Sequence, residues 1–139
     1  MKLLEAKAVL DQQEKNKLLY KMRIKSLVSL KDDWKSYLKS KNLDKLLDLY
    51  DKDCLFKGTL SDKAVIGKEG LEKYFVDFVK NVQSVRFLKE NKSIVKNDLV
   101  IESGKYNFYS GGKILNASYQ FVVDGKKNKI ISHYSSLIK

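Results

Sequence analysis

Few side chains in this sequence could do chemistry, and the first to consider is His133, the only histidine. It lies between Ser132 and Tyr134 in a segment with the alternation of a strand. An unperturbed histidine titrates near pH ~6.5, so His133 could act as an acid–base or hydrogen-bonding group. The alternative is a histidine that is satisfied by a backbone carbonyl at the surface of a sheet.

Aromatic side chains form the second candidate group, since the chain has eight tyrosines and six phenylalanines. Tyr106 shares a strand face with Phe108, and Tyr119 lies on the strand that follows. A tyrosine that lines a pocket offers an apolar ring together with a polar hydroxyl. The alternative is that these aromatic residues form only the core and a dimer interface. Tyr37 and Tyr74, on the apolar faces of predicted helices, leave the same two possibilities open.

Metal and cofactor chemistry find little support in the sequence. A single histidine and a single cysteine that lie far apart do not give the spacing of metal ligands. Cys54 lies in an apolar run, which is typical of a small buried side chain. Gly111 and Gly112 fall in a predicted hairpin and not before a helix, so they do not form a phosphate-binding loop. We therefore expect neither a metal nor a cofactor.

Helices are predicted to position the candidates of the N-terminal half. One helix is expected over residues 17–39, because apolar residues recur there at helical spacing: Leu19, Leu27, Leu30, Trp34 and Leu38. Residues 3–10 form a shorter apolar patch, and the polar run after it predicts a separate or frayed helical arm.

Two further helices are expected before the strands begin. Asn42 suits the N-cap of the second helix. Its apolar face is predicted from four residues: Leu43, Leu46, Leu47 and Tyr50. The third helix opens at residues 67–70 and presents Tyr74 and Phe78 on its apolar face.

Strands dominate the C-terminal half, where the apolar period changes to two. Expected strands cover residues 54–60, 99–109, 114–123 and 129–138, and residues 85–94 are expected to form one long strand or a broken pair of strands. Gly111-Gly112 and Asp124-Gly125 predict tight hairpins, whose strands are antiparallel neighbours. The pattern predicts an α+β fold with helices packed on one face of the sheet. We expect an N-terminal helical arm over residues 1–30 and one folded domain over residues 31–139.

The formal net charge of +11 raises the question of a nucleic-acid partner. The excess is spread evenly, at +5 over residues 1–50 and +6 over residues 51–139, and only Arg23 and Arg86 are arginines. Diffuse lysines support only weak, salt-sensitive binding, so nucleic acid is disfavoured. No apolar run approaches the ~20 residues of a membrane span. The first ten residues lack an uninterrupted apolar core for secretion, which makes a cytoplasmic location the default expectation, although a removed upstream leader is compatible with the sequence.

Five segments together resemble a known fold family. The segments LDLYDKDCLF and LEKYFVDFV resemble the nuclear transport factor 2-like superfamily, which includes SnoaL-like proteins. The segments SGKYNFY, ASYQFVVDG and ISHYSSLI are similar to bacterial relatives of the calcium/calmodulin-dependent kinase II association domain. The resemblance covers residues 33–138. It implies a cone-shaped fold in which helices pack on a strongly bent antiparallel sheet, and Gly104 lies mid-strand where such a sheet could bend.

The resemblance also implies a ligand pocket at the open end of the cone. The residues expected to line it are Trp34, Tyr37, Tyr74, Tyr106, Tyr119 and His133. The family's arginine is replaced by Ser118, and its second histidine is replaced by Tyr134. Because pocket arginines bind carboxylates, their loss argues against an anionic ligand.

Three functions follow from the resemblance and stay open at this point. The first is a non-catalytic, dimerising domain that binds a small molecule in a partly apolar pocket lined by tyrosine and histidine. The second is an isomerase, cyclase or hydratase that uses His133 as general base, for which Asp53 and Asp77 are the nearest carboxylates. The third is a pure association module. A homodimer and an unidentified small ligand are the expected partners.

Overall fold

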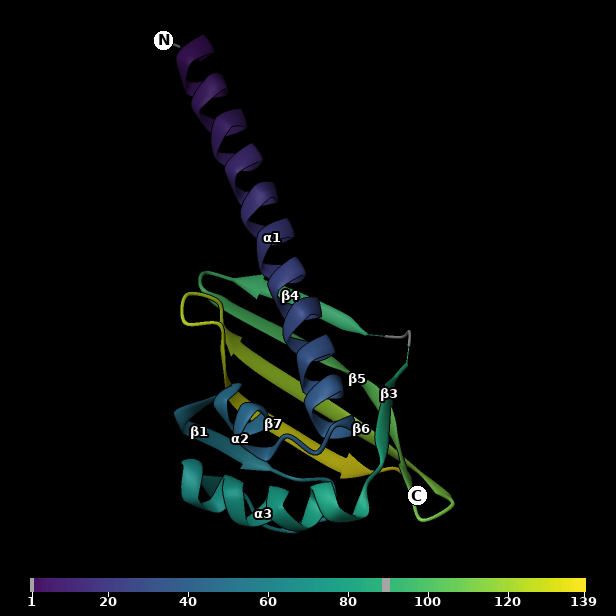
Figure 1. Cartoon of the computed structure of the whole chain (residues 1–139). Coiled ribbons are helices and arrows are strands. Elements are labelled where there is room, and N and C mark those ends of the chain that lie inside the picture. Colours follow the sequence, from purple (N-terminus) through teal and green to yellow (C-terminus); the bar gives the residue numbers. More distant parts are fainter. Residues whose placement is uncertain (1, 89–90) are drawn as a thin grey trace.

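The structure is a computed structural model that describes residues 2–88 and 91–139. Three helices and seven strands form one α+β unit, which confirms the predicted fold class (Figure 1). The helices are α1 (Lys2–Lys39), α2 (Leu43–Asp48) and α3 (Lys68–Asn81). The strands are β1 (Tyr50–Lys57), β2 (Val65–Ile66), β3 (Ser84–Phe87), β4 (Lys92–Lys96), β5 (Leu99–Ser110), β6 (Lys113–Asp124) and β7 (Lys129–Leu137).

Helix α1 is a single element of 38 residues, so the predicted break between an arm and a core helix was wrong. The polar run at residues 11–17 contains neither glycine nor proline, and nothing local ends the helix there. The C-terminal half of α1 lies across the sheet, and its N-terminal half projects beyond it (Figure 1). Leu27 and Leu30 are buried with the core. The last turns of the predicted arm, residues 1–30, therefore pack inside the domain.

Helices α2 and α3 begin where the sequence predicts. The Asn42 side chain accepts a hydrogen bond from the Lys45 backbone N–H at 3.3 Å. The second helix ends at Asp48, however, and Tyr50 is the first residue of β1 and not part of the helical face. Gly67 precedes α3 with a φ of 90°, a conformation that favours glycine.

The strands form one curved, open sheet in the order β2-β1-β7-β6-β5-β3, with β4 also paired to β5. The predicted hairpins are confirmed, and Gly111 and Gly112 have the positive φ values, 55° and 81°, of a tight two-residue turn. Strand β1 pairs with β7 in parallel, so the sheet is mixed and not wholly antiparallel as predicted. No tight turn joins β1 to β7, because more than half of the chain lies between them.

One edge of β5 is shared by two strands in succession. Strand β3 pairs with its second half, where Phe87 lies opposite Tyr106, and β4 pairs with its first half, where Lys92 lies opposite Ser103. Gly104 falls between the two. A Cβ on Gly104 would lie 3.0 Å from the Tyr119 hydroxyl oxygen, so this glycine makes room for the Tyr119 ring.

The core is unusually rich in aromatic rings, and Trp34 lies at its centre. Six rings have centroids 6.0–6.4 Å from that of Trp34: Phe75, Phe87, Tyr106, Phe108, Phe121 and His133. These residues come from α3, β3, β5, β6 and β7. Side chains therefore fill most of the space between α1 and the concave face of the sheet.

Candidate functional site

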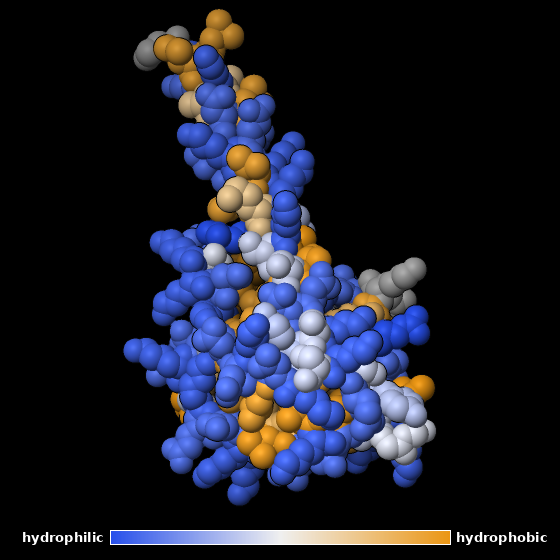
Figure 2. Space-filling view, viewed as in Figure 1, coloured by the Kyte–Doolittle hydropathy of each residue, from blue (hydrophilic) through white to orange (hydrophobic). Residues whose placement is uncertain are grey.

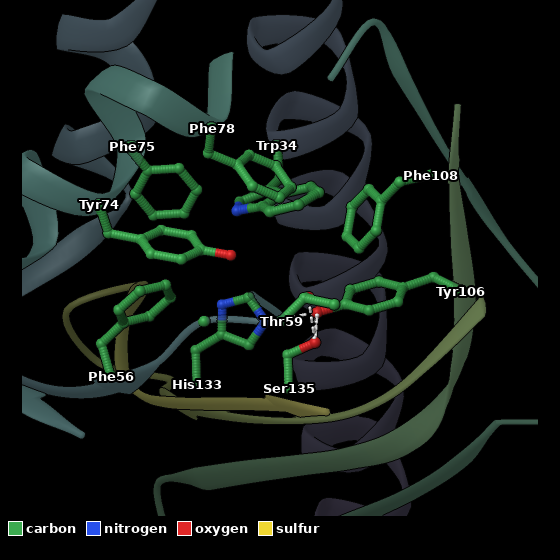
Figure 3. Close-up of a pocket in the computed structure, with 11 residues that line it drawn as sticks. Trp34, Phe56, Thr59, Tyr74, Phe75, Phe78, Tyr106, Phe108, His133 and Ser135 are labelled. Carbon is green, nitrogen blue, oxygen red and sulfur yellow. Dashed lines mark hydrogen bonds between the residues drawn. The ribbon is translucent and has the colours of Figure 1, made fainter. Parts of the chain in front are cut away.

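A small cavity lies between Trp34, α3 and strand β7 (Figure 3). Its volume is about 10 Å³, which is close to the space that one water molecule needs. Its lining residues are Trp34, Phe56, Gly58, Thr59, Tyr74, Phe75, Phe78, Tyr106, Phe108, His133 and Ser135. In Figure 3 the Trp34 and Phe78 rings lie above the cavity, and His133 and Ser135 lie below it.

A chain of buried hydrogen bonds begins at Trp34 and reaches His133. The indole N–H of Trp34 donates to the Tyr50 hydroxyl at 2.9 Å, and the Tyr50 hydroxyl lies 2.7 Å from Nδ1 of His133. An indole N–H can only donate, so the hydroxyl hydrogen of Tyr50 is left for Nδ1. This arrangement assigns the imidazole hydrogen to Nε2.

The chain of hydrogen bonds continues from His133 to the cavity. Nε2 of His133 lies 3.1 Å from the Tyr106 hydroxyl, which donates to Oγ of Ser135 at 2.6 Å. Oγ of Ser135 lies 2.5 Å from Oγ1 of Thr59, the contact that is dashed in Figure 3. All donors can therefore run in one direction, and the chain ends on a hydroxyl at the cavity wall.

Burial keeps this network electrically neutral. His133 is only 2% exposed, and desolvation lowers its pKa to about 3. Desolvation likewise raises the pKa values of Tyr50 and Tyr106 above the ordinary value. At neutral pH the imidazole and both phenols are uncharged, so the cavity favours neutral molecules.

A larger cleft lies outside the cavity, between the segment after β1 and helix α3. Its volume is about 200 Å³, and it is lined by Leu60, Tyr74, Asp77, Phe78 and Asn81. Tyr74 and Phe78 line both spaces and form the partition between them. The Tyr74 ring lies directly over Gly58, where an added Cβ would be 2.1 Å from the ring.

A second polar group lies deeper in the cone, on the other side of Tyr106. Oε1 of Glu102 accepts hydrogen bonds from Nζ of Lys31 at 3.0 Å and Nδ2 of Asn91 at 2.8 Å. Glu102 is buried. The pKa of Tyr119 is raised above its ordinary value, mainly by desolvation of the phenol and to a smaller extent by the negative charge of Glu102. Within the described residues, Oε2 of Glu102 and the Tyr119 hydroxyl have no hydrogen-bond partner.

The structure brings together four of the six residues that the sequence suggests for the pocket: Trp34, Tyr74, Tyr106 and His133. Tyr119 stacks behind Tyr106 at a centroid distance of 4.5 Å and does not line the cavity. Tyr37 does not line it either, and its ring lies 5.8 Å from Nζ of Lys45. Whether these residues bind a ligand stays a prediction.

Sequence reasoning missed several members of the polar groups. Ser135 could have been found, because it lies two residues after His133 and on the same strand face. Glu102 also gave a signal, since an acidic residue occupies an inward position of β5 between Val100 and Gly104. Thr59 gave none, because it lies after the end of β1.

The carboxylates considered for catalysis lie elsewhere. Asp53 is exposed on β1, and Asp77 is exposed on the outer side of α3 at the rim of the outer cleft. In the part of the chain that the structure describes, no group of three or more potential ligands could hold a metal ion. Of the described helices, none combines the length and the apolar character that crossing a membrane requires.

Comparison with solved structures places the fold. A protein from Xanthomonas campestris, provisionally named a calcium/calmodulin dependent protein kinase II association domain, matches with a TM-score of 0.70 and 27% identity over 81% of this chain and 85% of its own. A nuclear transport factor 2-like protein from Anabaena variabilis matches with a TM-score of 0.63 and 15% identity over 85% and 90%. This chain has the fold of the nuclear transport factor 2-like superfamily.

Members of the superfamily with enzyme names share the fold at lower identity. A protein from Parabacteroides distasonis, provisionally named a ketosteroid isomerase, has a TM-score of 0.66 and 18% identity over 81% of this chain and 86% of its own. No protein-family model matches this chain. No curated protein matches it either. The function of this chain must therefore be argued from its own residues.

Proposed function

We propose that this protein is a non-catalytic binding domain that works as a homodimer and takes up a small, neutral, partly apolar molecule at the mouth of its cone. One observation carries the proposal. The outer cleft of about 200 Å³ and the inner cavity of about 10 Å³ share Tyr74 and Phe78 in their walls. Ligand pockets usually span about 300–1,000 Å³, so the space suits a molecule of roughly one ring.

The hydrogen-bonded chain supports a neutral ligand. When the two rings of the partition turn aside, a hydroxyl or carbonyl group of the ligand reaches the Thr59 hydroxyl, where the chain ends. The lining residues of the cavity carry no charge, because His133 is neutral when buried. An anionic ligand would find no cation there to offset its desolvation.

Catalysis by His133 is disfavoured on two grounds. A general base works best when its pKa is near the working pH, whereas burial lowers the pKa of His133 to about 3. Both of its ring nitrogens are also occupied by protein hydroxyls, at 2.7 Å and 3.1 Å. The isomerase, cyclase or hydratase hypothesis therefore ranks second, although several structural neighbours carry such names.

The outer face of the sheet supports dimerisation. Ser103, Gln120 and Tyr134 lie side by side across β5, β6 and β7, and all three are exposed. A sheet with one face on the core leaves the other to water or a partner. This uncharged row suits a symmetric contact, and the Xanthomonas neighbour is itself named as an association domain.

Trp34 provides the readout for ligand binding, because it is the only tryptophan and lines the cavity. Benzyl alcohol and benzoate are titrated, with Trp34 fluorescence and saturation-transfer NMR as signals. Benzyl alcohol should bind saturably and benzoate should not. Phe78→Ala, which removes half of the partition, should tighten benzyl alcohol binding, whereas Ile114→Ala on an exposed strand position should not change it. Equal binding of benzoate, or no effect of Phe78→Ala, contradicts the proposed site.

Light scattering at micromolar concentration tests the dimer. The expected mass is at least twice that of one chain. Gln120→Lys places like charges face to face in a symmetric contact and should weaken the dimer. Ser36→Lys, on the exposed side of α1, is the matched control and should leave the mass unchanged. A stable monomer for the unaltered protein rules out this part of the proposal.

A further inference from the structure

The N-terminal half of α1 stands clear of the domain. We call residues 2–26 the free arm, because Leu27 is the first buried residue of the helix. Its last turn already contacts the domain, since Arg23 pairs with Asp98 and donates to the Gly125 carbonyl. Its tip is strongly apolar: Leu3 is 86% exposed and Leu4 is 72% exposed. Figure 2 shows hydrophobic side chains at the tip and again along the projecting helix. Most helical stability in proteins comes from packing of an apolar face, so the exposed apolar side chains of the free arm favour a partner that covers them.

Charge along the free arm divides into two halves of opposite character. Residues 2–14 carry two basic and three acidic side chains, whereas residues 15–25 carry five basic side chains and no acidic one. The change falls between Glu14 and Lys15. In an antiparallel pair of identical helices, residues 2–14 of one helix would therefore lie beside residues 15–25 of the other, and the two segments are complementary in charge.

Two grooves flank the basic half of the free arm. One, of about 390 Å³, is lined by Asn16, Lys17, Tyr20 and Lys21. The other, of about 340 Å³, is lined by Asn16, Leu19, Tyr20, Val95 and Asn97, and it lies between the helix and the turn from β4 to β5. Tyr20 borders both grooves and forms a ridge between them. A second helix laid along the free arm would fill one of these grooves.

We propose that the free arms of two copies of this chain pair with each other in an antiparallel arrangement, crossing between Glu14 and Lys15. This crossing brings Leu10 of the second copy level with Leu19, and Val9 of the second copy level with Tyr20. The apolar tip of each helix then covers the grooves of the other. The arrangement does not depend on the dimer contact across the sheet proposed above.

The charges favour an antiparallel direction of the two helices and a second copy of this chain as the partner. In a parallel pair the exposed lysines at residues 15–25, four on each helix, would lie beside each other and repel, whereas Arg23 is held by Asp98 of its own chain. The antiparallel pair instead places Glu5, Asp11 and Glu14 against the basic half of the other copy. An anionic membrane would attract the basic half of the free arm but repel these three acidic residues. A second copy of the chain, in contrast, offers opposite charge to both halves.

Charge exchange tests the pairing in the full-length protein by sedimentation velocity. Variant E5K/D11K/E14K makes both halves basic and should weaken self-association by roughly tenfold, since it reverses several exposed ion pairs at once. Adding K17E/K21E/K25E makes the inner half mainly acidic and should restore the association. All six positions are exposed on the helix, so folding should persist, with circular dichroism as the check. Failure of the second set to restore association overturns the proposal.

Disulfide cross-linking separates this contact from any other dimer. In a Cys54→Ala background, Glu14→Cys places one thiol at the crossing point of both helices and should cross-link efficiently. Glu5→Cys places the two thiols at opposite ends of the pair and should not. Equal cross-linking at both positions would indicate a parallel pair and overturn the proposal. Co-sedimentation of the unaltered protein with phosphatidylserine vesicles, without cross-linking of Glu14→Cys, would favour a membrane instead and also overturn it.

Discussion

The hydroxyl of Tyr50 lies 2.7 Å from Nδ1 of His133, a residue 83 positions later in the chain. The contact joins the first residue of β1 to the middle of β7. It also fixes the chemistry of the histidine, because Nδ1 accepts from Tyr50 and cannot take up a proton without breaking that hydrogen bond. His133, the first candidate for acid–base chemistry, is therefore held as a neutral side chain in the core.

Removing the Tyr50 hydroxyl should destabilise the protein. Tyr50→Phe leaves two buried polar groups without a partner, the indole N–H of Trp34 and Nδ1 of His133. We expect the free energy of unfolding to fall by about 1–3 kcal/mol, the cost of unsatisfied buried groups. Urea denaturation measures it. Tyr109→Phe, at a tyrosine that is 47% exposed, is the control, and an equal loss in both variants would contradict a role for the network.

Mildly acidic pH should destabilise the protein, because His133 takes up a proton more readily in the unfolded chain than in the folded protein. In the unfolded chain His133 takes up a proton near the ordinary value of 6.5, but in the folded protein its pKa is about 3. The unfolded state therefore binds the extra proton between these values, and stability is complete above pH 6.5 and declines below it. The expected slope approaches about 1.4 kcal/mol per pH unit.

The pH interval just below this value isolates the histidine, because the chain has no other. His133→Gln should lower stability near neutral pH and remove the slope between about pH 6.5 and 5, where carboxylates are still ionised in the unfolded chain. The measurement is the free energy of unfolding by urea across that interval. A slope that persists in His133→Gln would show that another group causes it.

The ion pair of Lys31 and Glu102 should show strong coupling. The two side chains are 12% and 4% exposed, and their charged atoms are 3.0 Å apart. Lys31→Met leaves a buried carboxylate that only Asn91 stabilises, at an expected cost of about 3–5 kcal/mol. The double variant Lys31→Met/Glu102→Gln removes both charges and should be more stable than Lys31→Met alone. Simple addition of the two single losses in thermal or urea unfolding would refute the coupling.

Because the Tyr74 ring lies over Gly58, even an alanine at position 58 should destabilise the protein. In Gly58→Ala the new Cβ would lie 2.1 Å from the Tyr74 ring, so the ring must move. We expect a loss of about 1–3 kcal/mol from overpacking. In a Tyr74→Leu background the same change should cost less, because no ring lies over position 58. Differential scanning calorimetry compares the four proteins, and an unchanged cost in the Leu background would argue for a backbone effect.

Sequence predicted the parts of the fold that depend on neighbouring residues. The spacing of Leu71, Phe75 and Phe78 defines the buried face of α3, the Asn42 side chain marks the start of α2, and Gly111-Gly112 marks a hairpin. Each of these signals acts within a few residues. The residue types and their spacing along the chain are therefore enough to predict these features.

Contacts between distant segments were the part that the sequence could not supply. Tyr50 suited the apolar face of a helix as well as the start of a strand, and only pairing with β7 decides between them. The size of the cavity depends on how Trp34 and the rings around it fill the cone. Because that packing joins six elements, no local pattern encodes a volume of about 10 Å³.

The parallel pairing of β1 with β7 imposes an order on synthesis. About 70 residues separate the two strands, so at 5–20 residues per second β1 leaves the ribosome roughly 4 to 14 s before its main partner. During that time only the two-residue β2 can cover one of its edges. Phe56 and Cys54, later buried, are exposed in the nascent chain. The core is therefore completed only when β7 has been synthesised, and in the interval before that its exposed apolar side chains are most prone to aggregation.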